Sequence, residues 1–106
     1  MRHANTHFES GNRFKANGQF EEAILELEKA IDLDYIDAQS YFNLALSYKN
    51  NGFIDEAIDV YRKTLEIDPK FAEAHFNLGI LLDRKGRNKE AEEELKEYME
   101  LTRQRT

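Results

Sequence analysis

Residues 38–71 read AQSYFNLALSYKNNGFIDEAIDVYRKTLEIDPKF, and this stretch decides the fold. Small and apolar residues recur in it at intervals of three and four positions, first before and then after Asn51-Gly52. Such spacing is typical of a helix with one buried face. Asn-Gly is a turn signal, because glycine tolerates the left-handed backbone that ends a helix. The stretch therefore predicts two helices joined by a tight turn.

The pattern occurs three times along the chain, with an interval of 34 positions. Five positions hold the same residue in every unit: Ala4, Ala38 and Ala72; Phe8, Phe42 and Phe76; Gly18, Gly52 and Gly86; Glu22, Glu56 and Glu90; Ala23, Ala57 and Ala91. A fixed period of this length indicates a solenoid, in which each unit buries its apolar face against its neighbours. We expect one domain over residues 1–106.

The expected units are 4–37, 38–71 and 72–105, and each should hold two helices. The predicted helices lie near 4–16, 21–33, 38–50, 55–67, 72–84 and 89–102. Asp37 is placed to cap the helix that starts at Ala38, and Asp68-Pro69 closes the second unit. The last helix carries Asn88 and Glu92 where earlier units have apolar residues, as expected of a terminal helix. We therefore expect a complete three-unit module.

Composition and charge exclude several classes of function. The 106 residues carry a net charge of −6, which disfavours nucleic acid or anionic lipid as a partner. There is no cysteine, and no apolar run is long enough for a signal peptide or a membrane span. His3 and His7 are four residues apart, but no third ligand is near, so we predict no metal site and no cofactor. A cytoplasmic location fits this composition.

The units resemble the tetratricopeptide repeat family over nearly the whole chain. The middle unit carries the resemblance best, through Leu44, Ala45, Tyr48, Gly52, Ala57, Tyr61, Leu65 and Pro69. The resemblance implies an all-α fold, an α-solenoid of three helix-turn-helix repeats forming a right-handed superhelix. It also implies a non-enzymatic module that binds a peptide or protein segment in its concave groove. Small residues at positions 11, 45 and 79 should let paired helices approach closely.

The resemblance also places the groove on the first helix of each unit. Carried onto this sequence, its residues are Phe8, Asn12, Gln39, Phe42, Asn43, Leu46, Lys49, Phe76, Asn77, Ile80 and Arg84. Aromatic side chains can seat apolar groups of a partner, and amides can pair with its backbone. The alternative is that the phenylalanines are partly buried packing residues and the asparagines bond between helices. Positive and negative groove residues balance, with Lys15, Lys49 and Arg84 against Glu9, Glu73 and Asp83.

One ligand known for this family is the C-terminal carboxylate of cytosolic chaperones. Its binding positions need two lysines, one arginine and two asparagines, but here they hold Phe8, Asn12, Asn43, Glu73 and Asn77. Because all three cations are missing, charge-assisted pairing with that carboxylate is lost and we exclude this ligand.

Two other functions remain open. One is a self-associating assembly scaffold, and the other is the substrate-recruiting part of a larger enzyme such as a glycosyltransferase. We expect a monomer, with weak self-association through apolar residues of the last helix such as Leu95, Met99 and Leu101. His75 should be a packed histidine, and Glu92, Glu93 and Glu94 should form a solvated face.

Overall fold

The computed structural model describes residues 11, 20–32 and 37–103. Five helices lie in these ranges: α2 (Phe20–Asp32), α3 (Ala38–Asn50), α4 (Ile54–Ile67), α5 (Ala72–Arg84) and α6 (Asn88–Arg103). Within the described ranges there is no strand. The predicted helices agree with these five to within a residue or so at each end. The helix expected at 4–16 lies outside the described residues, except that Gly11 is helical and buried.

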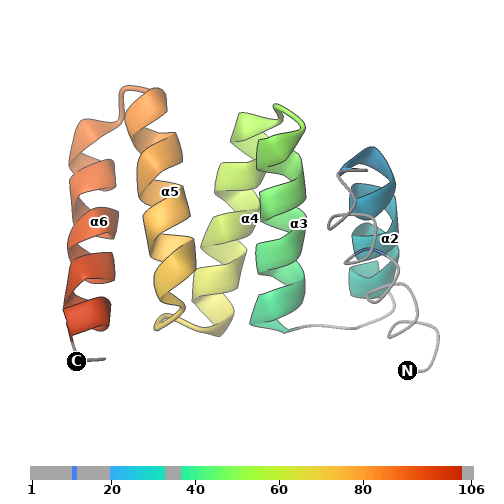
Figure 1. Ribbon diagram of the computed structural model, residues 1–106, viewed down its shortest axis with the longest axis horizontal. Coiled ribbons are helices and arrows are strands. Elements are labelled where there is room, and N and C mark those ends of the chain that lie inside the picture. Colours follow the sequence, from blue (N-terminus) through green and yellow to red (C-terminus); the bar gives the residue numbers. More distant parts are fainter. Residues whose placement is uncertain (1–10, 12–19, 33–36, 104–106) are drawn as a thin grey trace.

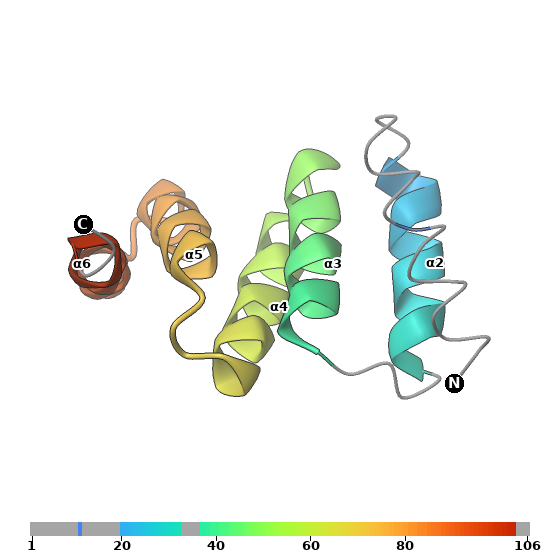
Figure 2. The ribbon, with the colours of Figure 1, turned by 60° about the horizontal axis from the view of Figure 1, so that its bottom comes forward.

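The helices form a single row in which each one packs against the next along the chain (Figure 1). Helices α3 and α4 make one antiparallel pair, and α5 and α6 make the next. Helix α2 packs on α3, and α4 packs on α5, so the pairs are joined in series (Figure 2). The Cα atoms extend over 39 × 28 × 22 Å, as expected of a short solenoid whose core runs along its length.

The turns inside the two complete pairs are closed by left-handed glycines. Gly52 has a φ of 86° and Gly86 a φ of 77°. Beyond each glycine the next backbone N–H reaches back into the helix: Phe53 N donates to Tyr48 O, and Arg87 N donates to Leu82 O, each at 2.9 Å. These bonds satisfy carbonyl groups that a helix end leaves free. At the start of α3, the carboxylate of Asp37 accepts from Ser40 N at 2.7 Å, which confirms the predicted cap.

Replacing Gly52 by valine should lower the free energy of unfolding by about 1–2 kcal/mol, because a branched residue adopts positive φ only at a cost. A side chain at this position would meet open space, so the effect isolates backbone strain from steric overlap. The measurement is the urea midpoint, with Glu56→Gln as a control on the exposed surface. Equal midpoints for the two variants would contradict a left-handed turn in solution.

The core is built from large side chains that fill the space between closely packed helices. Its largest fully buried members include Tyr61, Leu27, Leu78, Leu81 and Leu82. Small residues set the close approach that the sequence predicts. A Cβ atom added to Gly79 of α5 would lie 2.8 Å from Leu95 Cγ of α6. Ala45, Ala57 and Ala91 are buried in the same way, so any larger side chain there would push the paired helices apart.

The outer face of α6 is polar, with one large exception. Asn88 and Glu92 are exposed, whereas their counterparts Ile54 and Ile58 are partly or fully buried. Met99 is 61% exposed and gives this helix an apolar side chain in solvent.

Candidate functional site

The predicted groove residues of the two complete units lie along helices α3 and α5. Gln39, Phe42, Asn43, Leu46 and Lys49 follow one another at helical spacing on α3. Phe76, Asn77, Ile80 and Arg84 do the same on α5. We call these nine residues the α3/α5 face. Phe8 and Asn12, the two predicted residues of the first unit, lie outside the described residues.

The two aromatic residues of this face differ in environment. Phe42 is half-buried and stacks on Phe71, with ring centroids 4.7 Å apart and an interplanar angle of 21°. Its ring also lies 5.7 Å from that of Tyr61. Phe76 is 41% exposed and contacts Tyr98, with ring centroids 4.9 Å apart. Phe42 therefore serves the core as well as the surface, whereas Phe76 offers a large apolar area to solvent.

The amides of the face are already engaged within the protein. Asn43 is only 3% exposed, and its Oδ1 accepts from Gln39 Nε2 at 3.0 Å. Asn77 Nδ2 donates to the Tyr61 hydroxyl at 3.2 Å, which is a bond between helices. Burial raises the pKa of Tyr61 above its ordinary value, while the bond from Asn77 acts in the opposite direction. These bonds hold the amides in fixed orientations and leave Gln39 the most exposed of the three.

The remaining four residues of the face combine apolar area with positive charge. Leu46 and Ile80 are half-buried and lie about one helical turn before Lys49 and Arg84. Lys49 is half-buried and Arg84 is exposed. The surface thus presents exposed or half-buried apolar side chains followed, toward the end of each helix, by a cation.

Sequence reasoning missed a second feature, a histidine held by two acceptors. His75 Nδ1 lies 2.7 Å from Glu94 Oε2, and His75 Nε2 lies 2.7 Å from the carbonyl oxygen of Pro69. His75 is buried, as predicted, but Glu94 is not part of a purely solvated face. The contact joins the α4–α5 connection to α6. Another bond between helices comes from Tyr48, whose hydroxyl donates to Glu28 at 3.3 Å; burial, together with Glu28, raises the pKa of Tyr48 to about 12.

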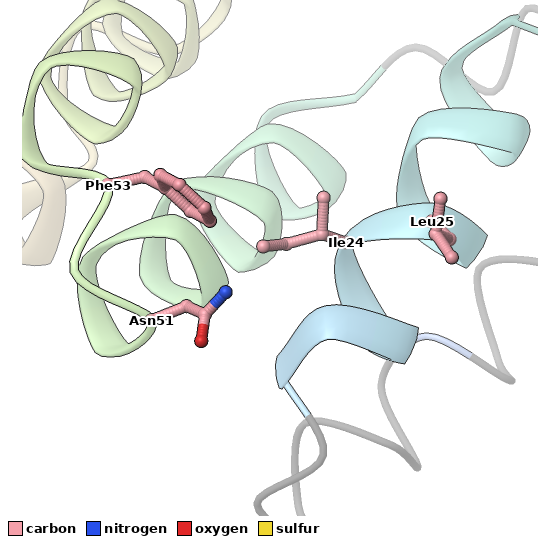
Figure 3. Close-up of a pocket in the computed structure, with 4 residues that line it drawn as sticks. All are labelled: Ile24, Leu25, Asn51 and Phe53. Atoms are coloured by element: carbon pink, nitrogen blue, oxygen red, sulfur yellow. The ribbon is translucent and has the colours of Figure 1, made fainter.

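A hollow of about 250 Å³ lies away from the α3/α5 face. It is lined by Ile24 and Leu25 of α2 and by Asn51 and Phe53 at the turn between α3 and α4. Ile24 and Phe53 point toward one another across it (Figure 3). Ile24 and Asn51 recur as Ile58 and Asn17, but the positions equivalent to Phe53 hold Gln19 and Arg87. Periodicity gave no signal for Phe53 in this site, and the described residues that line the hollow are uncharged and mostly apolar.

In the part of the chain that the structure describes, no three histidine, cysteine or acidic side chains come close enough to hold a metal ion. None of the described helices has both the length and the apolar character needed to cross a bilayer.

The geometry above is that of stacked helix-turn-helix repeats, and comparisons with known proteins agree. A family model described as TPR repeat matches residues 11–52, and one described as tetratricopeptide repeat matches residues 42–105. The chain belongs to the tetratricopeptide repeat family, and its fold is that family's right-handed α-solenoid. A search of the curated proteins found no match.

Several solved structures superimpose closely on this chain. A crystal structure of MamA is 30% identical, with a TM-score of 0.90 over 96% of this chain and 60% of MamA. YrrB, described as a TPR protein with an unusual peptide-binding site, is 25% identical, with a TM-score of 0.85 over 95% of this chain and 52% of YrrB. The second TPR of Spaghetti (RPAP3), bound to an HSP90 peptide, is 23% identical, with a TM-score of 0.87 over 93% of this chain and 92% of that domain. The chain thus spans about 60% of the MamA chain.

Proposed function

We propose that this chain is a non-enzymatic protein–protein interaction module that binds a peptide or protein segment along the α3/α5 face. The observation that carries the proposal is Phe76, which is 41% exposed beside the half-buried Ile80. Large apolar side chains in solvent are typical of binding surfaces when neighbouring groups add specific contacts. YrrB, a structural neighbour described as a TPR protein with an unusual peptide-binding site, supports the same class of function.

The arrangement of the face suits a peptide better than a small molecule. Its nine residues follow α3 and α5, the first helices of two successive units, for most of their length. Internal hydrogen bonds fix the amides of Asn43 and Asn77. These amides would therefore meet the backbone of a bound peptide in one fixed orientation, with little loss of side-chain freedom on binding. The proposal keeps the exclusions reached from the sequence: no nucleic acid, no membrane, no cofactor and no chaperone C-terminal carboxylate. It places the module in the cytoplasm as a single domain of three repeats.

We expect Phe76→Ala to weaken peptide binding by about 2 kcal/mol, close to thirtyfold in Kd, because it removes an exposed aromatic anchor. Phe53→Ala is a matched control, since Phe53 is 45% exposed but belongs to the hollow beside α2. Short random peptides would first be selected on the immobilised wild-type protein. The selected peptides would then be titrated against both variants by calorimetry. A loss confined to Phe53→Ala would move the partner to the hollow and sink the proposal.

A second candidate function is the self-associating scaffold, which Met99 favours because it is exposed on the last helix. Light scattering over a range of protein concentrations separates the two. An interaction module should keep the mass of one chain, whereas a scaffold should gain mass with concentration, and Met99→Gln should then abolish the gain.

A further inference from the structure

The hollow beside α2 gathers apolar surface that the core of the protein does not use. Phe53 is 45% exposed and Leu25 is 59% exposed, and both line this one recess. Ile24 faces Phe53 across it (Figure 3). Asn51 adds a side-chain amide that makes no hydrogen bond among the described residues. At about 250 Å³ the hollow is smaller than the cavities of about 300–1,000 Å³ that enclose drug-sized ligands, so a single apolar side chain fits it better.

An acidic side chain lies at the rim of the hollow. Glu28 follows Ile24 by four residues and Leu25 by three on α2, and these spacings bring side chains together on the surface of a helix. The Tyr48 hydroxyl donates to Glu28 Oε1 at 3.3 Å. The ring of Tyr48 in turn contacts the ring of Phe53 edge-on, with centroids 6.1 Å apart. A series of contacts therefore connects the carboxylate of Glu28 with the hollow.

This carboxylate has no cation beside it in the described part of the chain. Glu28 is exposed and belongs to none of the ion pairs there. Lys29, the next residue, instead pairs with Glu26 at 3.6 Å. The bond from Tyr48 uses only Oε1, so Oε2 remains available to a donor from another molecule.

The charge around the hollow favours a basic partner. Glu22 lies three residues before Leu25, and Glu56 lies three residues after Phe53. Both acids are exposed, and neither forms an ion pair among the described residues. Lysine or arginine is complementary to this rim. A second copy of the chain is a poorer match, because it carries the same net charge of −6.

We propose that the hollow is a second docking site, which takes a segment of a partner protein that presents an apolar side chain close to a lysine or arginine. The apolar side chain fills the space between Ile24 and Phe53, and the cation pairs with Glu28 at the rim. Apolar burial supplies most of the affinity, whereas the exposed ion pair mainly selects the partner. The hollow lies away from the α3/α5 face, so this inference does not depend on the proposed function.

The test is a selection of displayed random peptides on the Phe76→Ala variant, which weakens the α3/α5 face and keeps the hollow. The enriched peptides should combine an apolar residue with Lys or Arg. Adding Phe53→Ala to this protein should weaken their binding at least about tenfold, because it removes one wall of the hollow. Adding Met99→Ala is the matched control, since it removes a side chain that is 61% exposed on α6, and it should leave binding unchanged.

A second arm tests the charge at the rim. Glu28→Gln should weaken binding about two- to fivefold and make it less sensitive to salt, as expected of one exposed ion pair. Glu28→Lys should weaken binding further, and a selection on that protein should enrich acidic residues in place of basic ones. Glu97→Lys is the control, because Glu97 is an exposed glutamate on α6.

Three results would overturn the second docking site. The first is binding that Phe53→Ala leaves unchanged, and the second is a set of enriched peptides without a basic residue. The third is the failure of Phe76→Ala to enrich any peptide, which would leave the proposed function standing because that function is tested on the wild type. Light scattering covers the remaining occupant: a mass that grows with the concentration of the wild type, but not of Phe53→Ala, would assign the hollow to a second copy of the chain instead.

Discussion

Tyr61→Ala is expected to lower the free energy of unfolding by about 3–5 kcal/mol, as truncation of a large buried aromatic side chain does. Tyr61 of α4 has no exposed surface and is among the largest fully buried side chains. Its ring contacts that of Phe42 on α3, and its hydroxyl accepts a bond from Asn77 on α5. The residue thus connects two repeats, and its loss should leave a cavity where they meet.

Tyr61→Phe provides the matched control for this expectation. It keeps the ring and its packing but removes the partner of Asn77, which should cost about 1 kcal/mol. Urea unfolding followed by circular dichroism gives both values on one instrument. If Tyr61→Ala cost no more than Tyr61→Phe, the ring would contribute little and the junction between repeats would depend on other contacts.

The elements of the fold could be predicted from sequence because they depend on residues that repeat. Gly52 and Gly86 hold equivalent positions, and both adopt the left-handed backbone that the turn requires. Gly79 and Ala45 are also equivalent, and both are buried where paired helices meet. Because the units repeat with a fixed period, the helices predicted for one clearly patterned unit also predict the helices of the other units.

The candidate site was harder to predict because its character depends on residues that do not repeat. Phe42 and Phe76 are equivalent in sequence, yet Phe42 is stacked on Phe71 whereas Phe76 makes a tilted contact with Tyr98. The position equivalent to Phe71 one unit later, which would serve Phe76 in the same way, holds Arg105. Position in the unit predicted which helix face a residue joins, but not which neighbour it meets there.

One such contact did leave a signal in the sequence. Histidine and glutamate occur together at His7 and Glu26 and again at His75 and Glu94. The second unit instead has Tyr41 and Val60, an uncharged pair, at the same two positions. Two positions that change together across repeats are expected to be in contact. The structure shows that contact in the third unit, where Glu94 lies 2.7 Å from His75.

Replacing His75 by tyrosine, the residue of the second unit, is expected to destabilise the protein by about 2–3 kcal/mol. Both ring nitrogens of His75 face acceptors, Glu94 Oε2 and the carbonyl oxygen of Pro69. The ring donates both bonds only when both nitrogens carry a proton, and tyrosine offers a single donor in a different place. The variant would leave a partly buried carboxylate without its partner, which costs more than losing the bond alone.

The matched experiment is a double-mutant cycle in which the second unit's pair is built into the third. Glu94→Val alone removes the acid, and His75→Tyr/Glu94→Val restores a combination that the chain already uses at Tyr41 and Val60. The double variant should be more stable than His75→Tyr by about 1–2 kcal/mol, because no buried acid is left unpaired. Urea unfolding of the four proteins measures the coupling. Strictly additive effects would mean that His75 and Glu94 contribute independently, and that their contact does not hold α6 against the rest of the solenoid.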